Sequence, residues 1–226
     1  MNYILKFVII ISLIITTIFM WKQRQQFLLS STGTVIILNG PSASGKSSIQ
    51  KEFQYLMMPN LWIKLGIDSL FDNPMPDINN DNVTFWQEKN QIRWITTSKD
   101  QKNNTIITLF TGEEGNKVAY GMNSAIAAYA KNGCNIIVDY IAYKKEWLDD
   151  LQIKLKNIKT FLVKVSIPLT VLEEREASRN TSPKGHARSH YDYVYCNIAY
   201  DFEVNSDKES AVEIAKKIKE KIFPIN

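Results

Sequence analysis

Cysteine is scarce in this chain of 226 residues, which contains only Cys134 and Cys196. The two form neither a CxxC pair nor a metal-ligand pattern, so the sequence indicates no disulfide framework and no zinc site. Such cysteine usage is typical of a protein in a reducing compartment. Internal repeats and low-complexity tracts are also missing after residue 33, which favours a single domain.

Most of the chain has no excess of basic over acidic residues. The formal net charge is +4, but residues 1–33 contain Lys6, Lys22 and Arg24 and no acid, which leaves 24 basic and 23 acidic residues after position 33. Proteins that bind nucleic acids need a basic patch or a basic balance. We therefore expect no nucleic acid among the partners of this protein.

The chain instead carries an apolar segment at its start, residues 4–21. The residues that interrupt it are Lys6, Ser12, Thr16 and Thr17. A helix of about 20 mostly apolar residues spans a bilayer. We therefore expect residues 1–24 to be a single-pass membrane anchor, followed by a linker at residues 25–33. The alternatives are a buried segment or a cleaved signal peptide, which Trp21 and the polar residues after it disfavour. Basic residues on both sides of the segment leave its orientation open.

A turn rich in glycine and serine follows this linker. Residues 34–51 read TVIILNGPSASGKSSIQK, in which the spacing from Gly40 to Ser47 is GxxxxGK[ST]. This is the pattern of a P-loop, whose backbone N–H groups surround a phosphate at a helix N-terminus. We expect Lys46 to bind the β- and γ-phosphates of ATP and Ser47 to bind Mg²⁺. The residues expected to bind the nucleotide here are Gly40, Pro41, Ser42, Ala43, Ser44, Gly45, Lys46, Ser47 and Ser48.

The flanking residues supply the strand and the helix that a P-loop joins. Residues 35–38 form a β-branched-rich apolar run, as expected for a central parallel strand that is buried on both faces. After the loop, Ile49, Phe53 and Leu56 recur at helical spacing. A turn that binds nothing would have no reason to carry the Lys46–Ser47 pair in this context.

The rest of the domain, residues 34–226, alternates between the two patterns. Further strands are expected at residues 61–67, 135–138, 160–167 and 202–204, and helices at residues 120–131, 147–155 and 168–179. A last helix should begin at a capping box formed by Ser206 and Glu209. This alternation predicts an α/β protein with three layers and a central parallel sheet, of the P-loop nucleoside-triphosphate hydrolase fold.

Residues 72–117 interrupt that alternation. The segment contains Pro74 and Pro76, an extended stretch at residues 106–110 and an aromatic patch. The aromatic patch consists of Phe85, Trp86 and Trp94. Ligands of open α/β sheets bind beyond the carboxyl ends of the strands, so this insertion is placed to cover an acceptor pocket. Alternatively, its aromatic residues only pack a small core of the insertion itself.

Two aspartates follow apolar runs. Asp68 comes directly after LWIKLGI, where it could accept the proton of a substrate hydroxyl, or else cap a helix. Asp139 follows the run IIV, as the acid of a Walker B strand does, and would bind Mg²⁺. The alternative for Asp139 is a carboxylate bonded to loop amides.

Two arginines and a polar loop complete the set of candidate residues. Arg175 and Arg179 lie four positions apart in a helical pattern, an arrangement suited to clamping a phosphate unless they pair with neighbouring glutamates. The loop at residues 180–190 contains glycine, proline and basic residues, as expected of a lid over ATP. His186 and His190 lack the context of a metal-binding pair.

Five segments together resemble chloramphenicol phosphotransferase-like proteins. They are ILNGPSASGKSS, LGIDSLF, AYGMNSAIAAYAKNGCNIIVDYI, VLEEREASR and GHARSHYDYVYCNIAYDFEVNSDKES, and the resemblance covers residues 34–222. This resemblance implies a nucleotide-kinase-type or shikimate-kinase-like fold and ATP-dependent phosphorylation of a hydroxyl group on a small molecule. In chloramphenicol phosphotransferase itself, that hydroxyl is the primary alcohol of chloramphenicol. The resemblance also implies that Asp68 is the base and that Arg175 and Arg179 are lid arginines.

We therefore expect an ATP-dependent phosphotransferase with Asp68, Lys46, Arg175 and Arg179 as catalytic residues. Two alternatives remain open: a kinase for another hydroxyl metabolite, such as a zeta-toxin-like sugar nucleotide or a shikimate-like acid, and a non-catalytic membrane-tethered ATP-binding module. No NKxD motif indicates a GTPase. Because ATP and Mg²⁺ are required, we expect the catalytic domain on the cytoplasmic side of the membrane. The sequence leaves the oligomeric state unknown.

Overall fold

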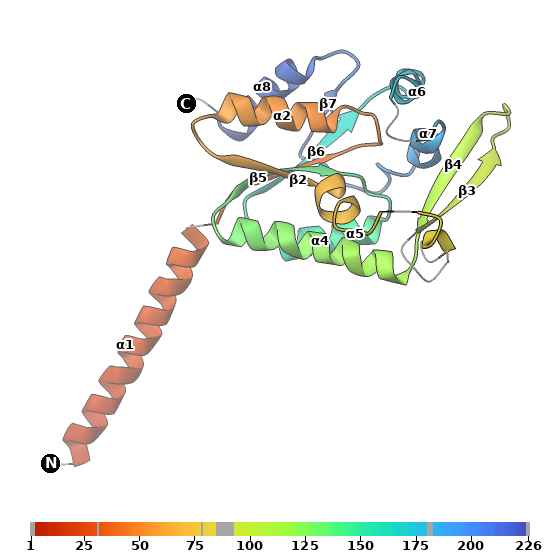
Figure 1. The fold of residues 1–226 in the computed structure, drawn as a ribbon. Coiled ribbons are helices and arrows are strands. Elements are labelled where there is room, and N and C mark those ends of the chain that lie inside the picture. Colours follow the sequence, from red (N-terminus) through yellow and green to blue (C-terminus); the bar gives the residue numbers. More distant parts are fainter. Residues whose placement is uncertain (1–2, 31, 78, 85–92, 180–182, 225–226) are drawn as a thin grey trace.

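The computed structural model describes residues 3–224 apart from residues 31, 78, 85–92 and 180–182. A long helix precedes an α/β domain (Figure 1). The helices are α1 (Tyr3–Ser30), α2 (Lys46–Met57), α4 (Glu113–Lys131), α5 (Lys145–Lys154), α6 (Leu169–Ala177), α7 (His186–His190) and α8 (Ala211–Ile222), with a π-helical turn η1 (Asp68–Asp72). The strands are β1 (Val35–Asn39), β2 (Trp62–Gly66), β3 (Arg93–Lys99), β4 (Thr105–Thr111), β5 (Asn135–Tyr140), β6 (Thr160–Ser166) and β7 (Phe202–Asn205).

Five strands form a parallel sheet in the order β2-β5-β1-β6-β7. Strand β1 lies in the centre, and all five of its residues are buried, as its apolar run predicts. The crossovers place the carboxyl ends of the strands at one edge of the sheet. Residues that follow β1, β2 and β5 therefore meet there, although they are far apart in the sequence.

Helices cover both faces of this sheet (Figure 1). On one face α2 and α8 pack against β1, β5 and β6, with Phe53 and Ile214 in a shared apolar cluster. On the other face α4 and α5 pack against the same sheet through a second cluster, which includes Ile126 and Leu148. The predicted three-layer α/β/α architecture with a central parallel sheet is confirmed.

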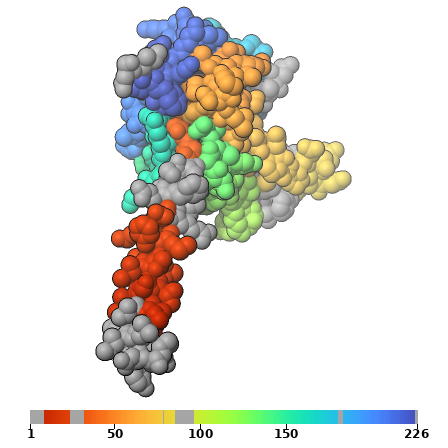
Figure 2. Space-filling model, turned by 90° about the vertical axis from the view of Figure 1, so that its left-hand side faces the viewer, coloured from red at the N-terminus to blue at the C-terminus, as the bar shows by residue number. Residues whose placement is uncertain are grey.

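The predicted membrane anchor is wrong. Helix α1 projects away from the domain (Figure 2), and its apolar side chains such as Ile15 and Trp21 are exposed. Within the described part of the chain, however, no helix combines the length and apolar character that crossing a bilayer requires. The structure therefore contradicts both the anchor at residues 4–21 and the membrane localisation inferred from it.

The insertion forms a two-stranded antiparallel hairpin, β3–β4, separate from the main sheet. Its strand β4 contains the expected extended stretch and packs against α7, where the Ile107 N–H donates to the Gly185 carbonyl over 3.1 Å. A Cβ on Gly185, which has φ of 96°, would lie 2.3 Å from the Thr105 carbonyl oxygen, so the two segments are in close contact. The predicted aromatic patch of Phe85, Trp86 and Trp94 lies outside the described side chains.

Helix α8 begins later than its predicted start. Its capping box is formed by Ser210 and Glu213, not by Ser206 and Glu209. Two interactions explain the difference. The Ser206 hydroxyl is bonded to Arg175, and the Glu209 carboxylate accepts the Asn205 N–H over 3.1 Å and pairs with Lys217. Both side chains are therefore engaged elsewhere and do not cap the helix.

Candidate active site

The P-loop connects the buried end of β1 to the start of α2. Ala43 and Gly45 adopt left-handed backbone conformations, with φ of 64° and 90°. Such backbone reversals are typical of the concave nests in which peptide N–H groups bind an anion. Gly40 is required for a different reason. A Cβ at this position would lie 2.6 Å from the Val165 carbonyl oxygen, so the loop fits beside β6 only without a side chain here.

The Lys46 ammonium group is held inside this loop. Its side chain is almost fully buried, and Nζ donates to the Pro41 carbonyl over 2.8 Å and to Ser44 Oγ over 3.3 Å. Asp139 Oδ1 lies 3.4 Å from Nζ. Burial lowers the pKa of Lys46, and the charge of Asp139 opposes that shift. A buried cation next to a row of N–H groups is suited to binding a phosphate.

Ser47 and Asp139 offer oxygen ligands for Mg²⁺. Ser47 Oγ donates to Asp139 Oδ2 over 2.6 Å, which joins the first turn of α2 to the end of β5. In the described residues no group of three or more His, Cys, Asp and Glu side chains is arranged to hold a metal ion. Mg²⁺ usually takes only one or two protein ligands, with water and phosphate oxygens as the others. The Ser47–Asp139 pair therefore fits this ion.

Asp68 lies next to this pair. It begins η1 directly after β2, and one concave site is lined by Asp68, Ser47 and Asp139 together. Burial raises the pKa of Asp68, the negative charges of Asp139 and Asp72 raise it further, and Lys46 opposes them. Ile67 is the N-cap of η1 and Asp68 is its first residue, so Asp68 does not occupy the capping position.

Gly66 allows this close approach, which no local sequence pattern predicts. A Cβ on Gly66 would lie 2.6 Å from the Asp139 carbonyl oxygen and 3.0 Å from Asp139 Cβ. A larger residue would push the end of β2, and Asp68 with it, away from β5. This requirement becomes visible only when the two strands are paired.

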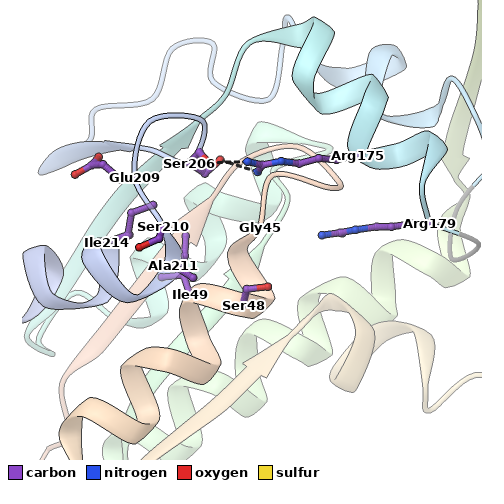
Figure 3. A pocket seen from close by; sticks show the side chains of 10 residues that line it. All are labelled: Gly45, Ser48, Ile49, Arg175, Arg179, Ser206, Glu209, Ser210, Ala211 and Ile214. Carbon is purple, nitrogen blue, oxygen red and sulfur yellow. Dashed lines mark hydrogen bonds between the residues drawn. The ribbon is translucent and has the colours of Figure 1, made fainter.

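Arg175 and Arg179 line a different cavity from the one that Asp68 lines. Together with Gly45 and Ser206 they line a second cavity (Figure 3). Helix α6 ends at Ala177, so Arg179 follows the helix rather than sharing its face. Arg175 Nη2 donates to the Ser206 carbonyl over 2.7 Å and Nη1 to Ser206 Oγ over 3.3 Å. Arg179 is exposed and extends toward the same cavity (Figure 3).

The predicted lid region contains a short helix where a loop was expected. Its residues 183–190 are described and include α7. The buried Glu176 carboxylate fixes the start of this helix, because it accepts the Gly185 N–H over 2.6 Å and the Ala187 N–H over 2.7 Å. At the other end, His190 Nε2 accepts the Ser42 N–H of the P-loop over 3.0 Å. Sequence spacing alone did not indicate this contact.

The P-loop lies at the carboxyl edge of a parallel sheet, next to an acidic side chain and to a cavity lined by two arginines. This combination defines the class of P-loop kinases. The family model for chloramphenicol phosphotransferase-like proteins matches residues 33–223, and the chain belongs to that family. It is a phosphotransferase enzyme that acts on small molecules.

Comparisons with individual proteins agree with this class. The chain is 28% identical over 191 residues to a Mycobacterium tuberculosis protein named "Putative O-phosphotransferase", with 83% of this chain and 81% of that protein covered. The APS kinase of the same organism, solved with AMPPNP and APS, has a similar fold, with a TM-score of 0.55, 16% identity and coverage of 83% of this chain and 95% of that one. Shikimate kinase from Acinetobacter baumannii, solved with shikimate, has a TM-score of 0.53, 14% identity and coverage of 85% and 94%.

Proposed function

We propose that this enzyme transfers the γ-phosphoryl group of ATP to a hydroxyl group of an uncharged small molecule. The observation that carries the proposal is the grouping of Ser47, Asp68 and Asp139 in one concave site beside the buried Lys46. Such a grouping would bring a proton acceptor, a metal-binding pair and a phosphate-binding cation together in one site. These are the components that phosphoryl transfer to an alcohol needs.

The cavity lined by Arg175 and Arg179 is the proposed place for the nucleotide. It runs from the P-loop residues Gly45 and Ser48 to the start of α8 and includes Ile214. The two guanidinium groups would contact the phosphates, while the end near α8 has room and apolar surface for the base. We propose that residues 180–190 act as the lid, since α7 connects the arginine-bearing segment with the P-loop.

Each side chain of the site would then have its own role in phosphoryl transfer. Asp68 would orient the acceptor hydroxyl and take its proton as the oxygen attacks the γ-phosphorus, and its raised pKa makes it a better base. Lys46, Arg175 and Arg179 would stabilise the negative charge that spreads over the phosphoryl oxygens. Mg²⁺, held by Ser47 and Asp139, would add charge neutralisation there.

A third cavity is the proposed acceptor pocket. It lies against the other side of η1 and is lined mainly by apolar and aromatic side chains, to which the insertion contributes Leu109 and Thr111. The remaining lining residues are Ile67, Phe71, Asp72, Tyr143 and Trp147. Among the described residues, this lining contains no lysine or arginine and one carboxylate, which favours an uncharged alcohol with an apolar body. An anionic acceptor, such as a sugar nucleotide or a shikimate-like acid, would require a cation there.

An acceptor panel tests this proposal. The full chain is incubated with ATP, Mg²⁺ and neutral alcohols, including chloramphenicol, beside anionic alcohols such as shikimate and a sugar nucleotide. We expect mass spectrometry to detect a phosphate ester on neutral members only. Phosphorylation confined to the anionic members would contradict the proposed acceptor class, and the absence of any phosphorylated product would contradict hydroxyl transfer.

Replacing Asp139 with asparagine should raise the Mg²⁺ concentration needed for half-maximal activity by about 10-fold or more, because an anionic oxygen ligand is lost. The substitution also removes the ion pair with Lys46. Steady-state rates measured over a Mg²⁺ titration check this effect. Asp149→Asn, at an exposed ion pair with Lys145 on α5, is the matched control and should leave the titration unchanged. An unchanged Mg²⁺ requirement in Asp139→Asn would exclude this carboxylate as a ligand.

A further inference from the structure

The only two histidines of the chain, His186 and His190, lie together on α7 beside the P-loop. Their ring centroids are 4.8 Å apart, and His190 is fully buried. His190 Nε2 is 3.0 Å from the Ser42 backbone nitrogen. A fully buried imidazole thus makes a hydrogen bond to the backbone of the loop that would hold the phosphates.

This hydrogen bond defines the protonation state of His190. A backbone N–H can only donate, so Nε2 must carry a lone pair and the ring proton must be on Nδ1. An imidazolium ring would direct a second N–H at the Ser42 N–H, and the bond would be lost. The contact with the P-loop therefore exists only for neutral His190 in its Nδ1–H form.

A chain of contacts connects His190 with the proposed acceptor pocket. Tyr143, which lines that pocket, has its ring centroid 4.9 Å from the His190 ring and bonds through its hydroxyl to His186 Nε2 over 2.9 Å. His186 Nδ1 donates to the Ile107 carbonyl of β4 over 3.3 Å. The two histidines thus lie between the insertion and the P-loop.

We propose that His190 is a positioning residue for phosphoryl transfer, and that its unprotonated Nε2 holds the P-loop in the conformation that binds the nucleotide. This inference rests on the proposed function, because it assigns the loop to ATP. His190 acts through Ser42 and takes no part in the chemical step. The same contact makes nucleotide binding sensitive to acid, since a proton on Nε2 breaks it.

The groups around His190 oppose its protonation. Burial lowers the pKa of His190 well below its ordinary value of 6.5, and the charges of His186 and Lys46 lower it further. A backbone hydrogen bond with His186 opposes this shift of the pKa. The other neighbours of the ring are the aromatic rings of Tyr143 and Tyr193, with centroids 4.9 and 6.4 Å away, and Ser189 Oγ, which lies 3.4 Å from Nδ1. Neutral His190 therefore persists at physiological pH, and its contact with Ser42 is lost only in acid.

Nitrogen NMR of the full chain labelled with ¹⁵N-histidine tests the protonation state without any acceptor. The two imidazoles are told apart by the His190→Gln variant, which leaves only the signals of His186. We expect His190 to show a protonated Nδ1 and an unprotonated Nε2 at neutral pH, and to titrate below pH 6.5. A protonated Nε2 or an ordinary pKa would overturn the proposal.

Nucleotide binding tests the positioning role. At pH above 7, His190→Ala should weaken ATP binding by about tenfold, because a backbone N–H loses its partner. The amide oxygen of His190→Gln can accept the same N–H, so this variant should stay within about threefold of the wild type. Tyr193→Phe, which keeps its ring against His190, is the matched control and should bind as the wild type does.

The pH dependence separates positioning from packing. As the pH falls below 6.5, the ratio of the wild-type Kd to that of His190→Gln should rise, because only the wild type loses its acceptor. The protonation of ATP changes both Kd values by the same factor, so it does not affect their ratio. Wild-type binding by a folded His190→Ala protein, or a constant ratio, would overturn the inference. If the wild type itself did not bind ATP, the proposed function would fail instead.

Discussion

Replacing Asp68 with asparagine should lower kcat for phosphoryl transfer by about 10²- to 10⁴-fold, the usual contribution of a general base. The amide has nearly the same shape as the carboxylate but cannot take a proton. ATP binding should persist, because the P-loop and Lys46 keep their own contacts. Single-turnover rates and nucleotide Kd values, measured on the same preparation, separate the two effects.

The same substitution should stabilise the fold at neutral pH. The folded pKa of Asp68 lies above its ordinary value of 3.8, so the folded chain holds this proton more tightly than the unfolded chain does. The free energy of unfolding therefore falls as the pH rises from 3.8 through the folded pKa. Asp68→Asn removes this penalty, so its Tm at pH 7 should exceed that of the wild type in metal-free buffer.

The control for both effects is Asp77→Asn, which changes an exposed carboxyl group outside the site. It should leave kcat and Tm unchanged. If Asp68→Asn retained wild-type turnover, Asp68 could not be the base. If it lost both activity and stability, the defect would be one of folding rather than of proton transfer.

Replacing either lid-region arginine with alanine should lower kcat by about 10²- to 10³-fold, the usual effect of removing one donor that stabilises transition-state charge. The two variants should differ in stability. Arg175 makes two hydrogen bonds to Ser206, so Arg175→Ala should also cost about 1–3 kcal/mol in the free energy of unfolding. Within the described residues the Arg179 guanidinium has no hydrogen bond, so Arg179→Ala should unfold at the wild-type temperature.

Steady-state kinetics and thermal denaturation of the two variants, with exposed Lys131→Ala at the end of α4 as the control, check this difference. A reduced kcat at unchanged Tm in Arg179→Ala would assign this side chain to charge stabilisation. Wild-type kcat in Arg179→Ala would remove it from the proposed mechanism. Equal losses of Tm in both variants would show that Arg179 has a structural contact that the geometry does not account for.

The catalytic edge of the sheet could be predicted from local sequence patterns. Lys46 and Ser47 could be located from the P-loop pattern and the strand and helix that flank it. The apolar runs before Asp68 and Asp139 likewise indicated that both acids lie near strand ends. Because parallel strands end at one edge, these separate patterns converge without knowledge of the sheet order. Strand β5 in fact continues through Asp139 to Tyr140, which local apolarity did not reveal.

Other features depend on contacts between distant segments. The start of α8 was misplaced because the side chains of Ser206 and Glu209 are bonded to Arg175 and Lys217, and a local capping pattern carries no such information. The contact of His190 with Ser42 spans 148 positions, so spacing within one helix could not indicate it. The anchor prediction failed for a different reason, because no described helix has the length and apolar character that a membrane span requires.

The most direct test of hydroxyl phosphorylation follows the labelled γ-phosphate of ATP in the presence of the full chain, Mg²⁺ and the best neutral alcohol from the panel. We expect one phosphate ester on the acceptor for each ADP formed, and the loss of this product in Asp68→Asn. Release of the label as free phosphate with an unmodified acceptor would contradict it, as would equal yields of the ester from the wild type and Asp68→Asn.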